Sequence, residues 1–557
     1  MKKLKKSWWV PTLIATTIGT AVYLVMPSDP AGPGPAEAQN DVRAVAQSLQ
    51  LAPDSPRALA APAAELSPAD AERLVVQKRQ LRERVASATA SNPPSPAGLA
   101  EVTGQGTQLV DGAEGRFHGT PSATQIGRNN TNTIGNGGAA STLAEPAAAN
   151  NGVQVLASGN SRHYEISGNG GVTWTSTTFP AGPSDAPTVC CDNDVIHDKG
   201  RGVTFLSTLY TNSSGPPTNG VVRIFVFRNI NTLTPNCSYT IDPAGTANNI
   251  VPDFPHLGLS NNHLYLTLNN LPAGAAQIRR FNIDNMADCV TAATNVVTLP
   301  SSVGQRIVTP ASGAKEVQYF TWAENSTTIR IWSWPQSSTT LTSVTRTLST
   351  SNFTNPDCRG GTLNNDFTDS LWSSIHGFNR RAAAGKGRLY VYWNVGPDAS
   401  HTQGHVHSAI FSEVGLTLLA QTPMFISGNT ACNGLPMIAT NDRGDLGIST
   451  AVGGRAGGGG TAAQAFVGIA DDFAGGIGFF PFLSLTASGT HNRTDQRYGD
   501  YFTVRPHNPC GGWWSATNYA LSGGTGVANV NSRYVEFGRS RDNGCWNEWK
   551  NAVPALQ

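Results

Sequence analysis

Carboxylate, imidazole and phenol side chains recur near the beginnings of segments that the sequence predicts to be strands. The candidate catalytic residues are Asp253, His256, His376, Tyr498 and Asp500. A glycoside hydrolase needs two carboxyl groups about 5 to 10 Å apart across a sugar, and Asp253 with Asp500 is the best pair. A polysaccharide lyase needs an acid and a base, commonly His and Tyr, with a cation that neutralises a uronate carboxylate. His256 or His376 with Tyr498 would supply the base and the acid, and Arg497 the cation.

Four further residues near the same beginnings are candidates for substrate binding. They are Arg306, Trp372, Arg497 and Tyr501. The segment that begins near residue 187 also offers Asp192, Asp194 and His197. A structural role is the alternative, in which the aspartates hold backbone amides where strands begin and the histidines bond to neighbouring carbonyls.

Three histidines, His401, His405 and His407, form a second group. His-x-His on a strand puts both imidazoles on one face, which is a metal-ligand geometry, but the nearby carboxylate is that of Asp398 alone. We therefore expect solvated hairpin histidines, no metal ion and no other cofactor. The glycine run at 453–460 lacks the strand, lysine and helix of a phosphate-binding loop.

The composition favours an exported β-protein and excludes some partners. The chain has 557 residues with 59 Gly and 35 Pro, and 13% of its residues are charged, about half the usual quarter. Lys and Arg number 38 against 37 Asp and Glu, with no basic stripe, so binding driven by phosphate neutralisation has no electrostatic basis. We expect no nucleic-acid partner.

The N-terminus is predicted to direct export. Four lysines among residues 2–6 precede an uncharged, mostly apolar run at 8–26, and Ala36-Glu37-Ala38 fits a cleavage site. Residues 1–38 are thus a signal peptide, or an anchor through 8–26 that would be the one contact with a membrane. Either form places the protein outside the cytoplasm, as a secreted, periplasmic or cell-surface protein.

A spacer is predicted between this segment and the folded domain. Residues 39–116 are rich in Ala and Pro and too poor in aromatics to fold alone, with one helix near 68–88. The folded domain is expected to span 117–557.

Eight cysteines in an exported chain favour disulfide bonds over a metal site. They are Cys190, Cys191, Cys237, Cys289, Cys358, Cys432, Cys510 and Cys545. Order along the chain suggests three pairs, namely Cys237 with Cys289, Cys358 with Cys432, and Cys510 with Cys545. Cys190 and Cys191 could bridge each other, bond to other cysteines or remain free thiols.

Beyond residue 117 the sequence predicts an all-β domain. Alternating apolar runs stand at 222–227, 263–268, 317–322, 329–334, 388–393 and 533–538. Clusters of Gly, Asn, Pro and Asp separate them, and no later stretch keeps a helical period.

A unit of four strands recurs in this region. Its openings lie near residues 152, 187, 253, 306, 370, 434 and 500. Seven such units predict a seven-bladed β-propeller, in which 117–150 could supply the outer strand that closes the last blade. A six-bladed ring or a two-sheet sandwich is the alternative. Ligands of propellers meet the loops and innermost strands at one end of the channel, where the candidate residues would fall.

Residues 167–174 read SGNGGVTW and fit the pattern Ser-x-Asp-x-Gly-x-Thr-Trp, with Asn169 in the Asp position. The domain therefore resembles the Asp-box (bacterial neuraminidase repeat) propellers of the sialidase-like superfamily. Asn169 would bond back to the turn, Gly171 would take a positive φ, and Trp174 would pack the turn onto its blade. Weaker relatives of the motif stand at 440–447 and 197–203.

The resemblance implies a glycan partner. The superfamily includes sialidases, other glycosidases, polysaccharide lyases and propellers without known catalysis. Sialidases usually carry an Arg-Ile-Pro motif, and the nearest triplets here, at 223–225, 306–308 and 330–332, lack the proline. We expect a monomeric glycoside hydrolase or polysaccharide lyase that is not a typical sialidase. A non-catalytic carbohydrate-binding or adhesion propeller at the cell surface is the alternative.

Overall fold

The computed structural model describes most of the chain from residue 124 to residue 551. The described residues are 124–131, 145–160, 163–212, 219–230, 232–243, 250–271, 275–299, 308–325, 327–348, 386–424, 431–453, 462–471, 483–490, 499, 501–521 and 530–551. The backbone alone is described at 42–43, 45–49, 64–65 and 373–381, and also at 131, 271, 323–325, 386 and 550–551 within the ranges above. The predicted export segment at 1–38 and the predicted helix near 68–88 lie outside these residues.

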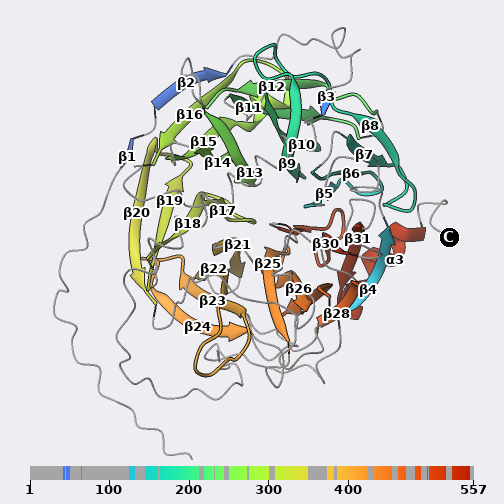
Figure 1. Ribbon diagram of the computed structural model, residues 1–557, viewed down its shortest axis with the longest axis vertical. Coiled ribbons are helices and arrows are strands. Elements are labelled where there is room, and N and C mark those ends of the chain that lie inside the picture. The colour runs from blue at the N-terminus through green and yellow to red at the C-terminus, as the bar shows by residue number, and fades with distance from the viewer. Residues whose placement is uncertain are drawn as a thin grey trace, which may run out of the picture. The chain divides into compact units, whose positions relative to one another are not determined.

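The described strands form seven sheets that follow one another around a central axis (Figure 1). Each contains an antiparallel blade of four strands, to which a short fifth strand is added in three of the sheets, and the strand that begins each blade lies nearest the axis. The chain is therefore a seven-bladed β-propeller, as the spacing of the seven units predicted.

The strand bounds by blade are as follows. Blade 1 consists of β5 (Ala147–Asn150), β6 (Val155–Ser158), β7 (His163–Ser167) and β8 (Thr175–Thr178). Blade 2 consists of β9 (Thr188–Asp198), β10 (Val203–Thr211), β11 (Gly220–Phe227) and β12 (Cys237–Ile241). Blade 3 consists of β13 (Val251–Leu259), β14 (His263–Leu271), β15 (Ala275–Asn282) and β16 (Ala292–Thr298). Blade 4 consists of β17 (Thr309–Pro310), β18 (Val317–Asn325), β19 (Thr328–Pro335) and β20 (Thr340–Thr347).

The remaining blades complete the ring. Blade 5 consists of β21 (Ser373–Arg381), β22 (Lys386–Val395), β23 (His405–Ser412) and β24 (Leu418–Met424). Blade 6 consists of β25 (Cys432–Thr440), β26 (Leu446–Gly453), β27 (Gln464–Ala470) and β28 (Leu483–Ala487). Blade 7 consists of β29 (Thr503–Pro506), β30 (Trp514–Leu521), β31 (Val530–Gly538) and β4 (Gln125–Thr131).

The ring is closed by a strand from the other end of the domain. β4 precedes blade 1 in the chain, yet it pairs antiparallel with β31 as the outer strand of blade 7. Earlier short strands pair with blades 2 to 4: β1 (Val42–Arg43) with β20, β2 (Val45–Leu49) with β16, and β3 (Ala64–Glu65) in parallel with β9.

Seven apolar clusters lie between neighbouring blades, and together they explain the strand sequences. Six of these clusters, counted among the described residues, take buried side chains from two adjacent blades, for example Phe225 of blade 2 with Tyr164 of blade 1, and Trp322 of blade 4 with Tyr265 of blade 3. The seventh joins blades 6 and 7 and also takes Phe254 from blade 3. A central strand such as β11 (GVVRIFVF) is buried along its whole length because both of its faces meet a neighbouring blade. Burial of this kind favours continuous β-branched and aromatic runs.

Two sequence-based predictions were wrong: the position of the first strand of blade 1, and the absence of helices beyond residue 117. The first blade opens at β5, about five residues before the predicted opening near 152, which leads into β6 instead. A nine-residue helix, α3 (Asn543–Asn551), follows blade 7 although no helix was expected there, and a shorter one, α2 (Ile283–Ala287), joins β15 to β16. No helix of the described residues is long and apolar enough to cross a membrane.

The SGNGGVTW segment forms the hairpin between β7 and β8. Asn169 Oδ1 accepts a hydrogen bond from Thr173 N at 2.9 Å, and Ser167 Oγ accepts one from Gly171 N at 2.7 Å. Gly171 has φ of +86°, and Trp174 lies nearby. The weaker relatives at 197–203 and 440–447 lie instead between the first and second strands of blades 2 and 6, so they are not repeats of this hairpin.

Three disulfide bonds join described cysteines. They are Cys190–Cys191, Cys237–Cys289 and Cys510–Cys545. The second and third were predicted, and the first is one of the three alternatives for the adjacent pair. Cys432 is also disulfide-bonded, and its predicted partner Cys358 lies outside the described residues.

Candidate functional site

Four innermost strands pair irregularly with the second strand of their blade. The shifts in register fall between Val189 and Asn193 in β9, Asp253 and His256 in β13, Ile375 and Phe378 in β21, and Gly434 and Met437 in β25. Positive φ values of 46°, 52° and 52° occur at Asp192, Phe254 and Leu435. A bulge turns the residues that follow it. The residues two positions later, Asp194, His256 and Met437, all line one pocket.

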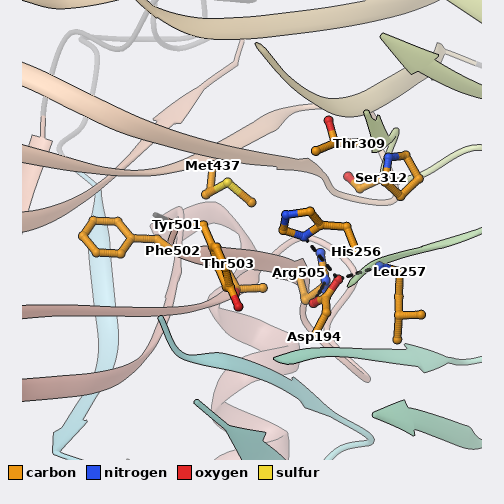
Figure 2. Close-up of a pocket in the computed structure, with 11 residues that line it drawn as sticks. Asp194, His256, Leu257, Thr309, Ser312, Met437, Tyr501, Phe502, Thr503 and Arg505 are labelled. Carbon is orange, nitrogen blue, oxygen red and sulfur yellow. Dashed lines mark hydrogen bonds and ion pairs between the residues drawn. The ribbon is translucent and has the colours of Figure 1, made fainter. Parts of the chain in front are cut away.

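The pocket lies between the inner parts of blades 2, 3, 4, 6 and 7 (Figure 2). The space between these side chains is small, with room for about one water molecule, and it is partly open to solvent. Its lining residues are Asp194, His256, Leu257, Thr309, Pro310, Ser312, Met437, Tyr501, Phe502, Thr503 and Arg505. The lining is thus mixed, with hydroxyl, imidazole and charged groups beside apolar side chains.

Asp194 is the charged centre of one wall, and Figure 2 shows it between Arg505, His256 and the amide of Leu257. Its carboxylate forms an ion pair with Arg505 and accepts a hydrogen bond from Leu257 N at 2.8 Å. His256 Nδ1 lies 3.9 Å from Asp194 Oδ2. Burial alone would raise the pKa of Asp194, but Arg505 and His256 outweigh it and lower the pKa below its ordinary value. Asp194 is therefore an anion at neutral pH and not a proton donor.

Arg505 is fixed by blade 2 although it belongs to blade 7. Besides the ion pair with Asp194, its Nε donates a hydrogen bond to Val195 O at 2.9 Å. The side chain is buried. A buried guanidinium held in this way compensates the charge of Asp194, and it positions the carboxylate beside His256.

Tyr501 connects the same two blades. Its hydroxyl donates to Asn193 O at 3.1 Å and accepts from Asn193 N at 3.0 Å. Its ring meets the His256 ring edge-on, with centroids 5.2 Å apart. Burial, followed by the charges of Asp192 and Glu145, raises the pKa of Tyr501 well above its ordinary value. The phenol therefore stays protonated and serves to hold the bulge of β9 in place.

A third set of contacts supports the bulge from blade 1. Asn160 accepts a hydrogen bond from Asp192 N and donates one to Glu145. Asp192 Oδ2 accepts a hydrogen bond from Phe254 N at 3.2 Å, which connects β9 to the bulge of β13. These buried contacts fix the backbone from which Asp194 and His256 project.

The structure brings two of the predicted site residues to this pocket, His256 and Tyr501. Asp253 is buried on β13 but does not line the pocket, and His376 lies in β21, where the backbone alone is described. The other candidates, Arg306, Trp372, Arg497, Tyr498 and Asp500, lie outside the described residues. Their placement, and the pairing of Asp253 with Asp500, stays a prediction. His197, offered with Asp194 by blade 2, bonds instead to Thr204 Oγ1 at 2.9 Å, away from the pocket lining.

Arg505 and Thr503 were missed, although the sequence contained a signal for them. Side chains two apart along a strand share a face. Counting in twos from Tyr501, which was a candidate, leads to Thr503 and then to Arg505, and all three line the pocket. Glu145 was also missed, since it precedes the first blade in a stretch that carries no strand signal.

The histidine group differs from expectation. His405 and His407 begin β23 and are 1% and 4% exposed, so they are not solvated hairpin histidines. Burial is the main cause that lowers the pKa of His405 to about 4 and that of His407 to about 3. Both rings are therefore neutral at pH 7.

No protein-family model matches the sequence, and no curated protein matches it. Solved structures with a similar fold include the NanB sialidase from Streptococcus pneumoniae, at 10% identity and a TM-score of 0.33, covering 74% of this chain and 71% of that one. The polysaccharide lyase Uly1 is similar at 11% identity and a TM-score of 0.35, covering 71% and 89%. The Dos1 propeller is similar at 8% identity and a TM-score of 0.37, covering 74% and 94%. These are similarities of fold, and no conclusion about activity follows from them.

Proposed function

We propose that this chain is an exported, carbohydrate-acting propeller that cleaves a uronate-containing polysaccharide by β-elimination at the pocket around His256. The observation that carries the proposal is the position of His256 on the pocket wall, with Asp194 Oδ2 at 3.9 Å from its Nδ1 and the Tyr501 ring at 5.2 Å. A carboxylate beside one ring nitrogen orients an imidazole and makes the other a better base. The disulfide bonds support a place outside the cytoplasm.

The reaction needs a base, an acid and a cation, and no co-reactant. His256 would remove the proton from C5 of the uronate, the electron pair would form the C4–C5 double bond, and the C4–O bond would break. Tyr498, predicted to stand near the start of blade 7, would protonate the leaving oxygen. Arg306 or Arg497 would neutralise the uronate carboxylate, since the charge of Arg505 is compensated by Asp194.

Hydrolysis with two carboxylates has less support from the described pocket. Among the described residues that line it, Asp194 is the one carboxylate, and its lowered pKa and its ion pair keep it from acting as an acid. A hydrolase would need a second carboxyl group 5 to 10 Å away, in about the range of known glycosidases. Asp500 would have to supply it.

A non-catalytic carbohydrate-binding propeller is the second candidate, and one observation favours it. The charged and phenolic groups of the pocket wall already bond to the protein itself. Asp194 and Arg505 neutralise each other, and the Tyr501 hydroxyl both donates to and accepts from the backbone of Asn193. A wall of this kind can bind a glycan through shape, hydroxyl groups and apolar contacts without chemistry.

The test is a screen of uronate-containing and neutral polysaccharides against wild type, His256→Asn and Asp500→Asn. We measure unsaturated uronates by ultraviolet absorbance and reducing ends by a colour assay. Elimination predicts unsaturated ends from wild type and a loss of about 10²- to 10⁴-fold in His256→Asn. His263→Gln, which removes a half-buried histidine of β14 outside the pocket lining, is the matched control and should keep full activity.

Each contrary outcome identifies a different error. Reducing ends without unsaturated uronates would show hydrolysis, and their loss in Asp500→Asn would give that residue the catalytic role. Full turnover in His256→Asn would remove His256 from the chemistry. Binding without turnover on every glycan would leave the binding propeller as the function.

A further inference from the structure

The hairpin between β22 and β23 brings three potential metal ligands together. His405 and His407 are two positions apart on β23, so their rings project from the same face, and Asp398 lies in the connecting loop. One ligand atom from each of the three residues lies within 4.8 Å of the other two. No other group of this kind occurs among the described residues.

The two imidazoles are buried without full hydrogen bonding. His405 is 1% exposed and His407 is 4% exposed. His405 Nε2 and His407 Nδ1 form no hydrogen bond within the described part of the chain, and His405 Nε2 lies 3.7 Å from Asp398 Oδ2. A buried polar atom without a partner is costly, so two in one cluster need an explanation. A bound cation between them would supply it.

The contacts around the cluster orient its ligand atoms. His405 Nδ1 lies 3.1 Å from Gln403 O, which fixes the proton on Nδ1 and leaves Nε2 with a lone pair directed toward Asp398. Asp398 Oδ1 accepts hydrogen bonds from the amides of Ser400 and His401, at 2.8 and 2.7 Å. Metal-bound imidazoles and carboxylates are held by such outer contacts in known sites.

We propose that Asp398, His405 and His407 bind a divalent transition-metal ion such as zinc. Two imidazoles and a carboxylate are zinc ligands, with bonds of about 2.0 to 2.2 Å, and small side-chain rotations would bring the ligand atoms to that distance. His401 contacts Asp398 through Nδ1 at 3.0 Å and positions the carboxylate. The remaining coordination position is available to water or a ligand, as in zinc sites with three protein ligands.

The site would stabilise a loop beside the inner strand of the next blade. Asn433 N, near the start of β25, donates a hydrogen bond to Gly404 O, next to His405. Leu435 N of the same strand donates to Asn394 Oδ1 at the end of β22. β25 also carries Met437 into the pocket. A metal ion at the hairpin would therefore hold β25, and with it the Met437 side of the pocket, in place. This effect would not depend on the chemistry at His256.

The test measures zinc binding to the full chain after treatment with a chelator and dialysis. Isothermal titration and competition with a chromophoric chelator give affinity and stoichiometry, and cobalt substitution gives a visible spectrum that reports coordination geometry. We expect one zinc ion per wild-type chain, and at least about 100-fold weaker binding in Asp398→Asn and His405→Gln, since each removes a direct ligand.

Two controls separate metal binding from folding. Asp398→Asn keeps an oxygen that can accept from the Ser400 and His401 amides, so it should fold as wild type by near-ultraviolet circular dichroism. His197→Gln removes a half-buried histidine of blade 2 far along the chain from the cluster and should bind zinc as wild type does. The absence of zinc binding at micromolar concentration in wild type, or equal affinity in wild type and Asp398→Asn, would overturn the proposal.

Discussion

The guanidinium of Arg505 in blade 7 forms an ion pair with the carboxylate of Asp194 in blade 2, 311 residues earlier in the chain. Blade 1 lies between these two blades in the order of the ring. The pair therefore passes the inner edge of blade 1, and Tyr501 with Asn193 makes a second connection of the same kind. The two connections join blade 7 to blade 2 near the centre of the ring.

We expect Asp194→Asn to lower the free energy of unfolding by about 3 to 5 kcal/mol, because it leaves the guanidinium of Arg505 buried without its counter-ion. Urea unfolding measures the effect. Asp442→Asn is the control, since Asp442 pairs with Lys199 where both side chains are more than half exposed, and its loss should cost about 0.5 kcal/mol or less. Equal effects in the two variants would show that the buried pair is not structural.

Tyr501→Phe should lower the free energy of unfolding by about 1 to 3 kcal/mol while the fold is kept. The hydroxyl is bonded to both the amide and the carbonyl of Asn193, and its removal leaves these buried groups without that partner. Denaturant unfolding with near-ultraviolet circular dichroism provides the measurement. Unchanged stability would mean that the bulge of β9 does not depend on this contact.

Gly171→Ala should destabilise the protein more than Gly202→Ala does. Both glycines have positive φ, +86° and +64°, so both changes carry a backbone cost of about 1 to 2 kcal/mol. A Cβ at residue 171 would also lie 2.5 Å from the Tyr534 ring, whereas a Cβ at residue 202 meets nothing within 4 Å. Thermal melts of both variants should differ by about 1 to 3 kcal/mol in this order. The reverse order would contradict the packing of this hairpin against blade 7.

Loss of the Cys510–Cys545 bond should cost about 3 to 4 kcal/mol of stability, because it closes a loop with a sequence separation of 35 residues. The double variant Cys510→Ala, Cys545→Ala removes the bond without leaving a free thiol. Chemical unfolding of this variant beside wild type measures the cost. A midpoint equal to that of wild type would indicate that contacts of α3, such as the stacking of Trp546 on Trp513, hold the C-terminus without the bond.

Stability should fall as the pH drops from about 6.5 toward 4. Burial is the main cause that lowers the pKa of His197 and of His263 to about 4 in the folded chain. The unfolded chain therefore binds more protons in this interval, and each histidine lowers the free energy of unfolding by at most about 1.4 kcal/mol per pH unit. The double variant His197→Gln, His263→Gln should show a smaller slope in urea unfolding between pH 7 and pH 4.5. An unchanged slope would assign the acid sensitivity to other groups.

The number of blades and most strands could be predicted because strands that are buried between blades need β-branched and aromatic residues, and these are visible in the sequence. Strands such as β11 and β22 are largely buried and are rich in β-branched and aromatic residues. β5 was displaced in the prediction because its sequence, AAAN, has no strand preference and is buried by context alone. α3 was missed because one short amphipathic turn around Trp546 and Trp549 gives no sustained period.

The sequence predicted which strand beginnings carry site residues, but not which of these residues contact one another. His256 and Tyr501 were found because polar residues at the beginning of a predicted inner strand are unusual. The pairing of Asp194 with Arg505 depends on ring closure, and the aim of both side chains depends on bulges at Asp192 and Phe254 that have no glycine to mark them. The burial of His405 and His407 likewise comes from neighbouring strands, not from their own sequence.

The closing strand imposes an order on biosynthesis. Arg128 of β4 pairs with Glu536 of β31 at 3.2 Å, and 408 residues separate them in the chain. At the usual translation rate of 5 to 20 residues per second, β4 is synthesised roughly 20 to 80 s before its partner strand exists. The strands of blades 1 to 6 all lie between β4 and β31 in the chain, so blade 7 needs both ends of the domain. A chain that stops before residue 530 lacks β31 and leaves β4 with no edge to join, so a truncated domain cannot close its ring in this way.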